Sequence, residues 1–200
     1  LNHALTNHVR EPYFAVVDAD EILPVGFLRQ LVPYLQNDPE CGFVQANHRC
    51  EEETSTQLQE DMRIGIDVHW KWYQPLRNKF GFVMFLGHGA LLRRSCWEQV
   101  GGFDADIFLY HEDDDLSMQL RAHGPLMRIP AAQVMHQEGR GSARTPQVAA
   151  FKAYHMARSK VYTYAKHGRR RTWARTMAEA CLSFLSPMMF NRRKRAKAVG

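Results

Sequence analysis

The sequence lacks any apolar run approaching the roughly 20 residues that a bilayer-spanning helix needs. Its longest apolar stretch, residues 80–86, has the length of a strand. The four cysteines form no C-x-x-C pair and no metal-like spacing, which argues against a disulfide scaffold and indicates reduced thiols in the cytosol. There is no P-loop, no internal repeat, and no RRM, KH or helix-turn-helix pattern. These absences argue against P-loop phosphotransfer and against sequence-specific nucleic-acid recognition.

Charge is distributed unevenly along the 200 residues, whose formal net charge is +5. From Lys166 onward there are ten Lys or Arg residues and a single acid, Glu179, so this segment carries +9. The remaining 16 basic and 20 acidic residues give the preceding part a net charge of −4. The basic character therefore belongs to a tail, and the body is mildly acidic.

The hydrophobic pattern alternates between strands and helices, which predicts an α/β fold with a mainly parallel sheet. Ser95-Cys96-Trp97-Glu98 matches a capping box at the start of a short helix. We expect strands at residues 13–17, 42–46, 80–86, 90–92, 126–129 and 133–136, and helices at about 24–38, 57–73, 95–101, 112–123, 145–167 and 173–185.

Asp18-Ala19-Asp20 follows the first expected strand. Alternate residues of an extended chain share a face, so both carboxylates can point toward one crevice at the carboxyl end of the sheet. Two hard oxygen ligands there suit Mg²⁺ or Mn²⁺. The alternative is a pair of turn acids, because Asp also favours the starts of loops.

A second acidic group, residues 112–115, begins an expected helix after His111. Acids in a first helical turn are favoured by the helix dipole, and this explains one or two of them. Four in a row exceed what capping requires, and their crowding raises the proton affinity of each, as a general base needs. His136, which leaves a strand toward a Gly-rich turn, is a weaker candidate for contact with a metal or diphosphate.

Together these segments resemble glycosyltransferase family 2, the inverting nucleotide-sugar enzymes with the GT-A fold. Four motifs carry the resemblance in the family's order, over about residues 1–167. The first is the strand with the D-x-D at residues 14–21. The second combines the Gly, apolar and Arg-Arg segment at 87–94 with the Gly-Gly-Phe-Asp segment at 101–104. The third is the E-D pair Glu112-Asp113 followed by Asp115-Leu116, and the fourth is the late His136.

The resemblance implies a GT-A domain over residues 1–167 and a role for each motif residue. Asp20 would bind Mg²⁺ or Mn²⁺ at the donor diphosphate, Asp18 would contact the donor ribose or the metal, and His136 would complete that site. Asp113 would take the proton from an acceptor hydroxyl, with inversion at the sugar carbon. The acceptor-side residues would be Gly87, His88, Gly89 and Glu112.

The implied reaction transfers a sugar from a nucleotide-sugar donor to a glycan or lipid-linked glycan, as in cell-envelope polysaccharide synthesis. Residues 1–5 resemble the end of a family segment whose Lys is absent, so we expect an N-terminally truncated catalytic domain that binds nucleotide poorly. A processive polysaccharide synthase is an alternative, but the nearest match to its Gln-x-x-Arg-Trp motif, at residues 137–141, lacks the Trp.

The expected tail, residues 168–200, alternates basic blocks with apolar ones. Such a segment suits an anionic membrane surface, which predicts a cytoplasmic protein with peripheral attachment to the inner face of the cell membrane. Two alternatives stay open. In the first, the tail packs its apolar residues on another part of the protein. In the second, the chain is a non-catalytic basic protein that binds membranes or, without sequence specificity, nucleic acid.

Overall fold

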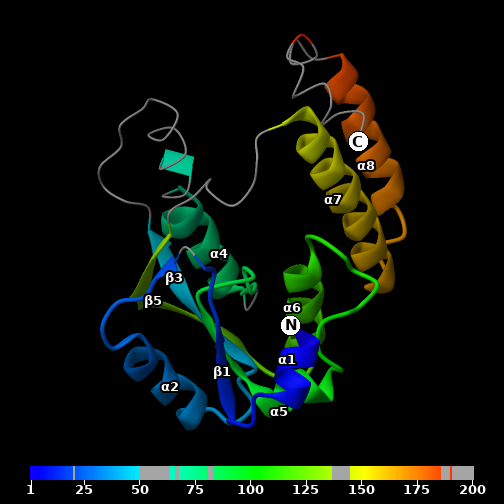
Figure 1. Ribbon diagram of the computed structural model, residues 1–200. Helices are drawn as coiled ribbons and strands as arrows, with labels where there is room; N and C mark the ends of the chain where they lie inside the picture. The colour runs from blue at the N-terminus through cyan, green and yellow to red at the C-terminus, as the bar shows by residue number, and fades with distance from the viewer. Residues whose placement is uncertain are drawn as a thin grey trace. The chain divides into compact units, whose positions relative to one another are not determined.

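The computed structural model describes residues 1–19, 21–49, 64–65, 68–80, 83–136, 145–185 and 190. The chain divides into two compact units. The first consists of residues 1–103 and 116–140, and the second of residues 104–115 and 141–200. Figure 1 shows the strands, which belong to the first unit, and the two long helices of the second.

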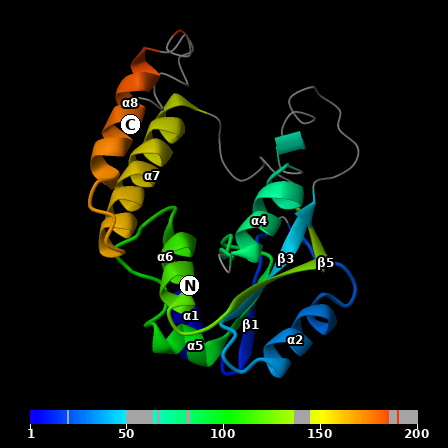
Figure 2. The same cartoon turned by 180° about the vertical axis from the view of Figure 1, so that it is seen from behind.

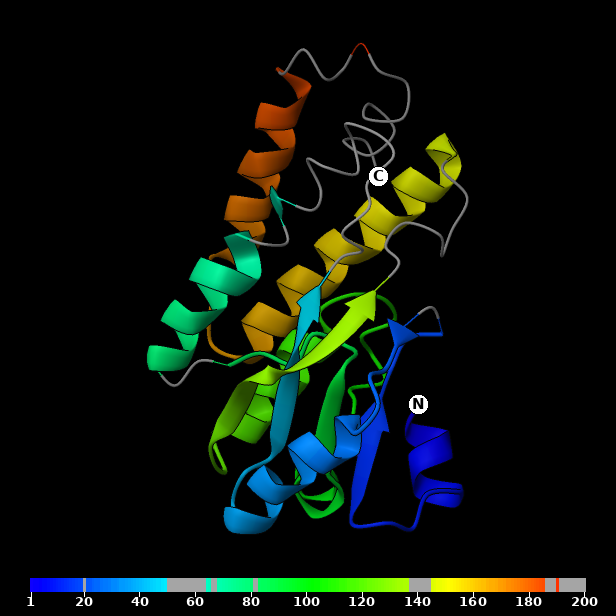
Figure 3. The same cartoon turned by 90° about the vertical axis from the view of Figure 1, so that its left-hand side faces the viewer.

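A five-stranded sheet forms the centre of the first unit, in the order β1-β4-β3-β5-β2. β3 and β5 run side by side in parallel, as Figure 3 shows, while β4 pairs antiparallel with both β1 and β3 and β2 pairs antiparallel with β5. β1, β3 and β5 therefore share one direction, which β4 and β2 oppose. The strands are β1 (Tyr13–Val16), β2 (Glu21–Ile22), β3 (Phe43–Arg49), β4 (Ala90–Arg93) and β5 (Leu126–His136).

Helices cover both faces of this sheet, with α2 (Phe27–Asn37) on one side and α1 (Asn2–Asn7) and α5 (Arg94–Gln99) on the other (Figures 1 and 2). The alternation of β3 explains the arrangement, because neighbouring strand residues point to opposite faces. Val44 packs with Leu31 and Leu35 of α2, whereas Phe43 packs with Trp97 of α5. Each such fully buried side chain contributes about 1.5–3 kcal/mol of transfer free energy.

Three further helices contribute residues to the first unit. The π-helix η1 (His69–Tyr73) continues into α4 (Gln74–Lys79) in the first unit. α6 (Glu112–Arg121) begins in the second unit, and its later residues Leu116 and Leu120 belong to the core of the first. No helix among the described residues is long and apolar enough to span a bilayer.

The second unit contains the antiparallel neighbours α7 (Pro146–Lys166) and α8 (Thr172–Phe184). α7 begins as the sequence predicts, with Thr145 Oγ1 accepting a hydrogen bond from the Val148 N–H at 3.2 Å. Lys160 of α7 forms a 2.7 Å ion pair with Glu179 of α8. α8 itself has no buried residue, which leaves apolar side chains such as Trp173 and Leu182 exposed.

The α/β fold class is confirmed, but the strand expected at residues 80–86 is wrong for its described part. Residues 83–86 form no strand, although Val83 and Phe85 are buried. Here the backbone N–H groups bond to side chains instead of to a neighbouring strand. Ser117 Oγ accepts a hydrogen bond from the Phe85 N–H at 2.8 Å, and Gln45 Oε1 accepts one from the Leu86 N–H at 3.1 Å.

Two helix starts also differ from the expectation. α5 begins at Arg94 without a side-chain cap, and Glu98, the presumed end of a capping box, instead pairs with Arg94 at 2.7 Å. α2 begins at Phe27 rather than near Pro24, because Gly26 adopts the left-handed conformation at φ +83° and ends the preceding turn.

The expected helix over residues 57–73 is described only from residue 64, and its helical part extends to Lys79.

Candidate functional site

A tight turn links β1 to β2 and carries the first half of the D-x-D motif. The Asp18 carbonyl accepts a hydrogen bond from the Glu21 N–H at 3.1 Å, and Glu21 Oε2 accepts one from the Asp18 N–H at 2.9 Å. Asp18 is exposed, as a ligand-binding carboxylate can be. Asp20 lies outside the described residues. The Asp18 end of the motif is therefore held by one residue, Glu21, which was not among the predicted site residues.

Glu21 also connects this turn to the expected acceptor-side segment. Its side chain is fully buried, and its Oε1 lies 2.6 Å from Nδ1 of His88. His88 is the middle residue of Gly87-His88-Gly89, immediately before β4. The structure thus brings Asp18, Glu21 and His88 together, joining the predicted donor-side and acceptor-side motifs through one carboxylate.

Gln45 of β3 fixes the backbone of the acceptor-side turn. Its amide nitrogen donates to the carbonyl oxygens of His88, at 2.9 Å, and Gly89, at 3.1 Å. Its carbonyl oxygen accepts from the Leu86 N–H. Since Gln45 is only 1% exposed, these hydrogen bonds form away from water, where leaving a polar group unpaired costs the most. The turn is therefore held by a side chain in the sheet.

Gly89 cannot be replaced without disturbing this arrangement. It has φ +63°, and a Cβ atom at this position would lie 2.5 Å from His48 Nε2 and 3.2 Å from Glu21 Oε1. His48, on β3, is 8% exposed and stacks on the ring of Trp70 with centroids 4.7 Å apart. The sequence analysis did not select His48. The polar character of 45–49 in an otherwise buried strand was the available signal.

His136 ends β5, and its Cα is the register partner of Glu21. The antiparallel ladder therefore places His136 across from the residue that directly follows Asp20. The grouping of His136 with Asp18 and Asp20 stays a prediction, since Asp20 lies outside the described residues.

The E-D motif begins α6 in the second unit, after a strained turn. Tyr110 and His111 both have φ 64°, the left-handed region that non-glycine residues rarely adopt. Two such residues in succession cost of order 1–3 kcal/mol each, and such strain clusters at functional sites. His111 then anchors the helix, because its Nδ1 lies 2.6 Å from Asp114 Oδ2 and its carbonyl accepts from the Asp115 N–H at 2.9 Å.

Asp113, the second residue of the E-D motif, has a raised pKa. Burial, followed by the negative charges of Asp114 and Glu112, raises its pKa to about 6. One of its oxygens accepts the Asp114 N–H at 2.9 Å, which acts in the opposite direction. A carboxylate with a pKa near the working pH is suited to accept and release a proton. The crowding predicted from sequence contributes, but burial is the larger cause.

The neighbouring acids have other partners. Asp115 is completely buried and forms ion pairs with Lys166 Nζ at 2.9 Å and His167 Nε2 at 2.8 Å. Glu112 Oε2 is buried and has no hydrogen-bond partner among the residues that the structure describes. The four consecutive acids thus lie in distinct environments, and the environment of Asp113 raises its pKa to about 6.

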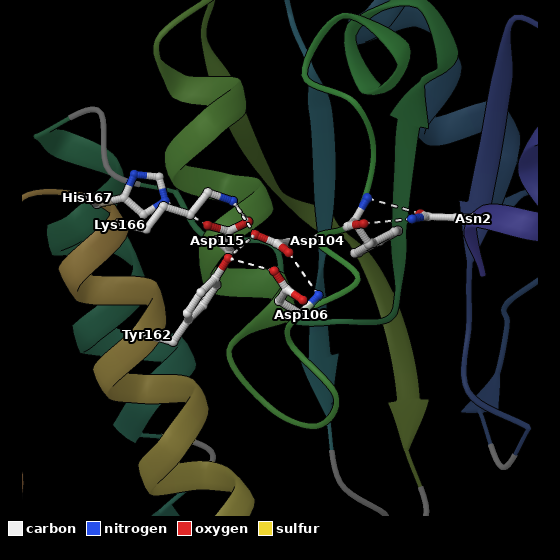
Figure 4. A network of polar contacts seen from close by, with 8 residues as sticks. Asn2, Asp104, Asp106, Asp115, Tyr162, Lys166 and His167 are labelled. Carbon is white, nitrogen blue, oxygen red and sulfur yellow. Dashed lines mark hydrogen bonds and ion pairs between the residues drawn. The ribbon is translucent and has the colours of Figure 1, made fainter.

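A polar network in the second unit fixes the loop before α6, as Figure 4 shows. Lys166 Nζ pairs with Asp104 at 2.6 Å as well as with Asp115. The Tyr162 hydroxyl donates to the carboxylates of Asp104, at 3.2 Å, and Asp106, at 3.4 Å. Burial alone would raise the pKa of Asp104, but the hydrogen bonds from Lys166 and the Asp106 N–H outweigh it and lower the pKa. The end of α7 therefore orders the approach to the E-D motif.

In the first unit, the Gly-Gly-Phe-Asp segment is held by Asn2. Its amide nitrogen donates to the Phe103 carbonyl at 2.6 Å, and its amide oxygen accepts from the Phe103 N–H at 3.0 Å. Gly102 has φ +79°, and a Cβ there would lie 2.6 Å from the Trp97 ring. The expected Gly-Gly pair is therefore required by backbone conformation and by close packing.

Comparison with known proteins assigns the chain to a family. The sequence profile described as "Glycosyltransferase like family 2" matches residues 1–158. The chain belongs to this family. The motif residues described above all lie within the matched region, and the family resemblance drawn from the four motifs is confirmed.

Curated relatives of this glycosyltransferase family 2 chain match over part of its length. N-acetylglucosaminyl-diphospho-decaprenol L-rhamnosyltransferase of Mycobacterium tuberculosis is 36% identical over 92 residues, 46% of this chain and 27% of that protein. Glucomannan 4-beta-mannosyltransferase 1 of Cyamopsis tetragonoloba is 30% identical over 116 residues, 56% of this chain and 21% of that protein. The chain thus matches about a quarter of the length of these relatives.

A solved structure supports the GT-A-like α/β fold. A mannosyltransferase from Pyrobaculum calidifontis, in complex with GDP-Man and Mn²⁺, matches all of this chain and 61% of its own length. The TM-score is 0.50 and the sequence identity 17%, so the likeness concerns the fold.

Proposed function

We propose that this family 2 chain is part of an inverting, metal-dependent glycosyltransferase. It would transfer a sugar from a nucleotide-sugar donor to a hydroxyl group of a glycan or lipid-linked glycan, without processive elongation. The observation that carries this proposal is the Asp113 carboxylate, whose pKa of about 6 suits a general base, in the E-D motif of a chain that belongs to this family.

Asp113 is the proposed base for the acceptor hydroxyl. Near neutral pH, a carboxylate with this pKa is mostly ionised, yet it is basic enough to take the proton as the hydroxyl oxygen attacks the sugar carbon. Attack from the face opposite the leaving diphosphate inverts that carbon. The hydrogen bond from the Asp115 N–H to the His111 carbonyl and the strained Tyr110–His111 turn would hold the base in position before substrate arrives.

Asp18, Asp20 and His136 are the proposed ligands of a divalent metal ion. The two carboxylates suit Mn²⁺ or Mg²⁺, and the β2–β5 register sets His136, which would complete the site, across from the residue after Asp20. When bound, such an ion neutralises charge on the departing diphosphate. The similar mannosyltransferase that was solved with GDP-Man and Mn²⁺ supports this choice of cofactor.

The acceptor would approach Gly87-His88-Gly89, the turn that Gln45 and Glu21 hold in place, together with Glu112. The names of the relatives support a glycan or polyprenol-linked acceptor, since one acts on N-acetylglucosaminyl-diphospho-decaprenol and another makes glucomannan. The first relative favours a non-processive enzyme and the second a polysaccharide synthase. The missing Trp at residues 137–141 favours the former.

The substitution Asp113→Asn tests the proposed base, with Asp114→Asn as the matched control. Loss of a general base lowers turnover by about 10²–10⁴-fold, and Asn preserves the shape of the side chain. We expect this loss for Asp113→Asn, with little change in donor affinity, and at most a few-fold change for Asp114→Asn. The assay would measure sugar transfer from UDP-, GDP- and dTDP-sugars by the full-length protein.

Equal turnover in the two variants would refute the assignment of Asp113. Adding EDTA and then Mn²⁺ or Mg²⁺ tests the metal separately, and activity that persists in EDTA would refute the metal-dependent reaction. Product stereochemistry, read by NMR at the new anomeric centre, tests inversion.

The tail following residue 167 is proposed to contact an anionic membrane surface. Arg169, Arg170 and Arg171 precede α8, and the exposed apolar residues of α8 include Trp173, Met177 and Leu182, exposed by 59–66%. Each basic residue near an anionic surface contributes about 1 kcal/mol.

Cosedimentation with phosphatidylglycerol vesicles tests this contact. We expect Arg169, Arg170 and Arg171 replaced together by Gln to reduce the bound fraction several-fold, while the single change Arg121→Gln on α6 leaves it unchanged. Equal recovery of the triple variant and the unchanged protein would refute a membrane role for these residues.

A further inference from the structure

Three metal-ligating side chains meet in the first unit: Glu21, directly after the D-x-D pair, His48 of β3, and His88 of the acceptor-side turn. One carboxylate oxygen of Glu21 and one ring nitrogen each of His48 and His88 lie within 4.8 Å of one another. They come from the start of β2, from β3 and from the turn before β4, which are distant in sequence. Only the fold brings these three ligands together.

The chemistry of this set differs from that of the proposed D-x-D site. Two imidazoles and one carboxylate form the three-ligand set of many zinc sites, which leave a fourth position for water or substrate. Imidazole nitrogens suit Zn²⁺ and similar transition metals, whereas Mg²⁺ and Mn²⁺ prefer oxygen. The set is therefore matched to a softer ion than the D-x-D carboxylates would bind.

One pair of ligand atoms requires only a small adjustment to hold an ion. Glu21 Oε1 and His88 Nδ1 are 2.6 Å apart, a hydrogen-bond distance. Ligands at about 2.0–2.1 Å from a tetrahedral zinc ion lie about 3.3 Å apart, so this pair would open by less than about 1 Å. The metal takes the place of the hydrogen between the two atoms, and His88 then carries its ring hydrogen on Nε2.

Gly89 supplies the space between two of the ligands. Its missing Cβ would lie 2.5 Å from His48 Nε2 and 3.2 Å from Glu21 Oε1. Any other residue would fill the region that the two ligating atoms face. A glycine is also suited to the backbone here, with φ +63°.

Neighbouring groups hold the ligands in place, as metal sites require of their surroundings. The Asp18 N–H donates to Glu21 Oε2 and leaves Oε1 directed at His88. The Trp70 ring stacks on His48, and Gln45 fixes the backbone carbonyls of His88 and Gly89. The Glu21 side chain is fully buried, so its position is defined by packing.

We propose that Glu21, His48 and His88 form a binding site for a zinc-class divalent transition metal, separate from the D-x-D metal site. The ion fixes the acceptor-side turn at residues 87–89 to β3 and to the start of β2, and its fourth position is open to water. This inference does not depend on the proposed transferase activity, because the site is defined by the three ligands alone.

Metal binding to the full chain tests the proposal directly. Equilibrium dialysis against Zn²⁺, followed by elemental analysis, should give one tightly held ion per chain. Co²⁺ in its place should give the visible absorption of a four-coordinate site. Removing any one ligand, by His48→Ala, His88→Ala or Glu21→Gln, should weaken Zn²⁺ binding by about 100-fold or more.

Two controls separate this site from others. His123→Ala changes an exposed histidine outside the cluster and should bind Zn²⁺ as the unchanged chain does. Asp20→Asn should keep the Zn²⁺ site, and its loss in that variant would show that the ion belongs to the D-x-D motif and would overturn the proposal.

Failure of the unchanged chain to bind Zn²⁺, or unaltered binding in the ligand variants, would also overturn it. Circular dichroism checks that each variant folds. Should an alanine variant unfold, two measurements on the unchanged chain decide the matter: the Co²⁺ spectrum and a rise in melting temperature with Zn²⁺, both of which the proposal requires.

Discussion

The acidic segments at residues 18–21 and 112–115 are similar in sequence, but their carboxylates have different structural partners. In the first, the conformation is set by one residue, Glu21, whose two oxygens serve the Asp18 N–H and His88, while Asp18 stays exposed. In the second, each acid has its own environment. Asp115 is paired and buried, Asp114 is held by His111, and Asp113 has a pKa of about 6.

This difference shows that the number of acids says little about the role of each. A buried carboxylate with cationic partners stabilises the fold as an anion, whereas one that is buried beside other anions has its charged form destabilised. Asp113 and Asp115 are only two residues apart, so the environment of each carboxylate is set by its partners and not by its position in the sequence.

The largest predicted effect on stability comes from removing the buried ion pair. Asp115→Ala leaves Lys166 and His167 without their shared partner, and we expect the free energy of unfolding to fall by about 3 kcal/mol. Asp18→Asn, at an exposed acid of the other segment, should change it by less than about 0.5 kcal/mol. Urea denaturation of both variants measures the contrast, and equal losses would contradict it.

Asp113→Asn should act in the opposite direction from Asp115→Ala. Its pKa is higher in the folded chain, at about 6, than the ordinary 3.8. The folded state therefore binds the proton more tightly, and stability falls as pH rises from about 4 through 6.

At pH 8 the substitution should raise the free energy of unfolding by about 1–2 kcal/mol, a value reduced because the side chain is only partly buried. Below about pH 4 the gain should vanish, since both states are then protonated. Urea denaturation at pH 4 and pH 8 checks this, and a pH-independent gain would point to a cause other than Asp113 ionisation.

The smallest effect concerns the pH dependence of transfer. If Asp113 is the base, kcat/KM falls about tenfold for each pH unit below 6, because protonation removes the base. Asp114→Asn removes one of the negative charges that raise this pKa, so the acid limb should shift to lower pH. Initial rates from pH 5 to 8 would show the shift, and an unmoved limb would separate the titrating group from Asp113.

Much of the fold follows from local pattern. The hydrophobic periodicity of α2, α6, α7 and α8, with the Thr145 cap of α7, predicts their existence because each depends on neighbours within a few residues. The stretch at residues 83–86 does not follow, since its backbone bonds to Gln45 and Ser117, which are far away in sequence. The capping box at residues 95–98 fails for a related reason, because Glu98 pairs with Arg94.

The candidate site divides in the same way. Asp18, Asp20, Asp113 and His136 were selected because they belong to motifs with a recognisable order. Glu21, Gln45 and His48 were missed because nothing in their spacing shows that they meet. Their polarity inside or beside buried strands was a signal, but only the pairing of β3 with β4 and of β2 with β5 gives it meaning.

The sequence alone determined the family, the α/β class and the four motifs, because these depend on residue type and order. It also contains no C-x-x-C pair, no long apolar run and no RRM, KH or helix-turn-helix pattern. Tertiary structure decided which of the four consecutive acids has a raised pKa, because burial and neighbouring charge set proton affinity. It also decided that Glu21, His48 and His88 meet, because contacts between distant segments exist only once the sheet has formed.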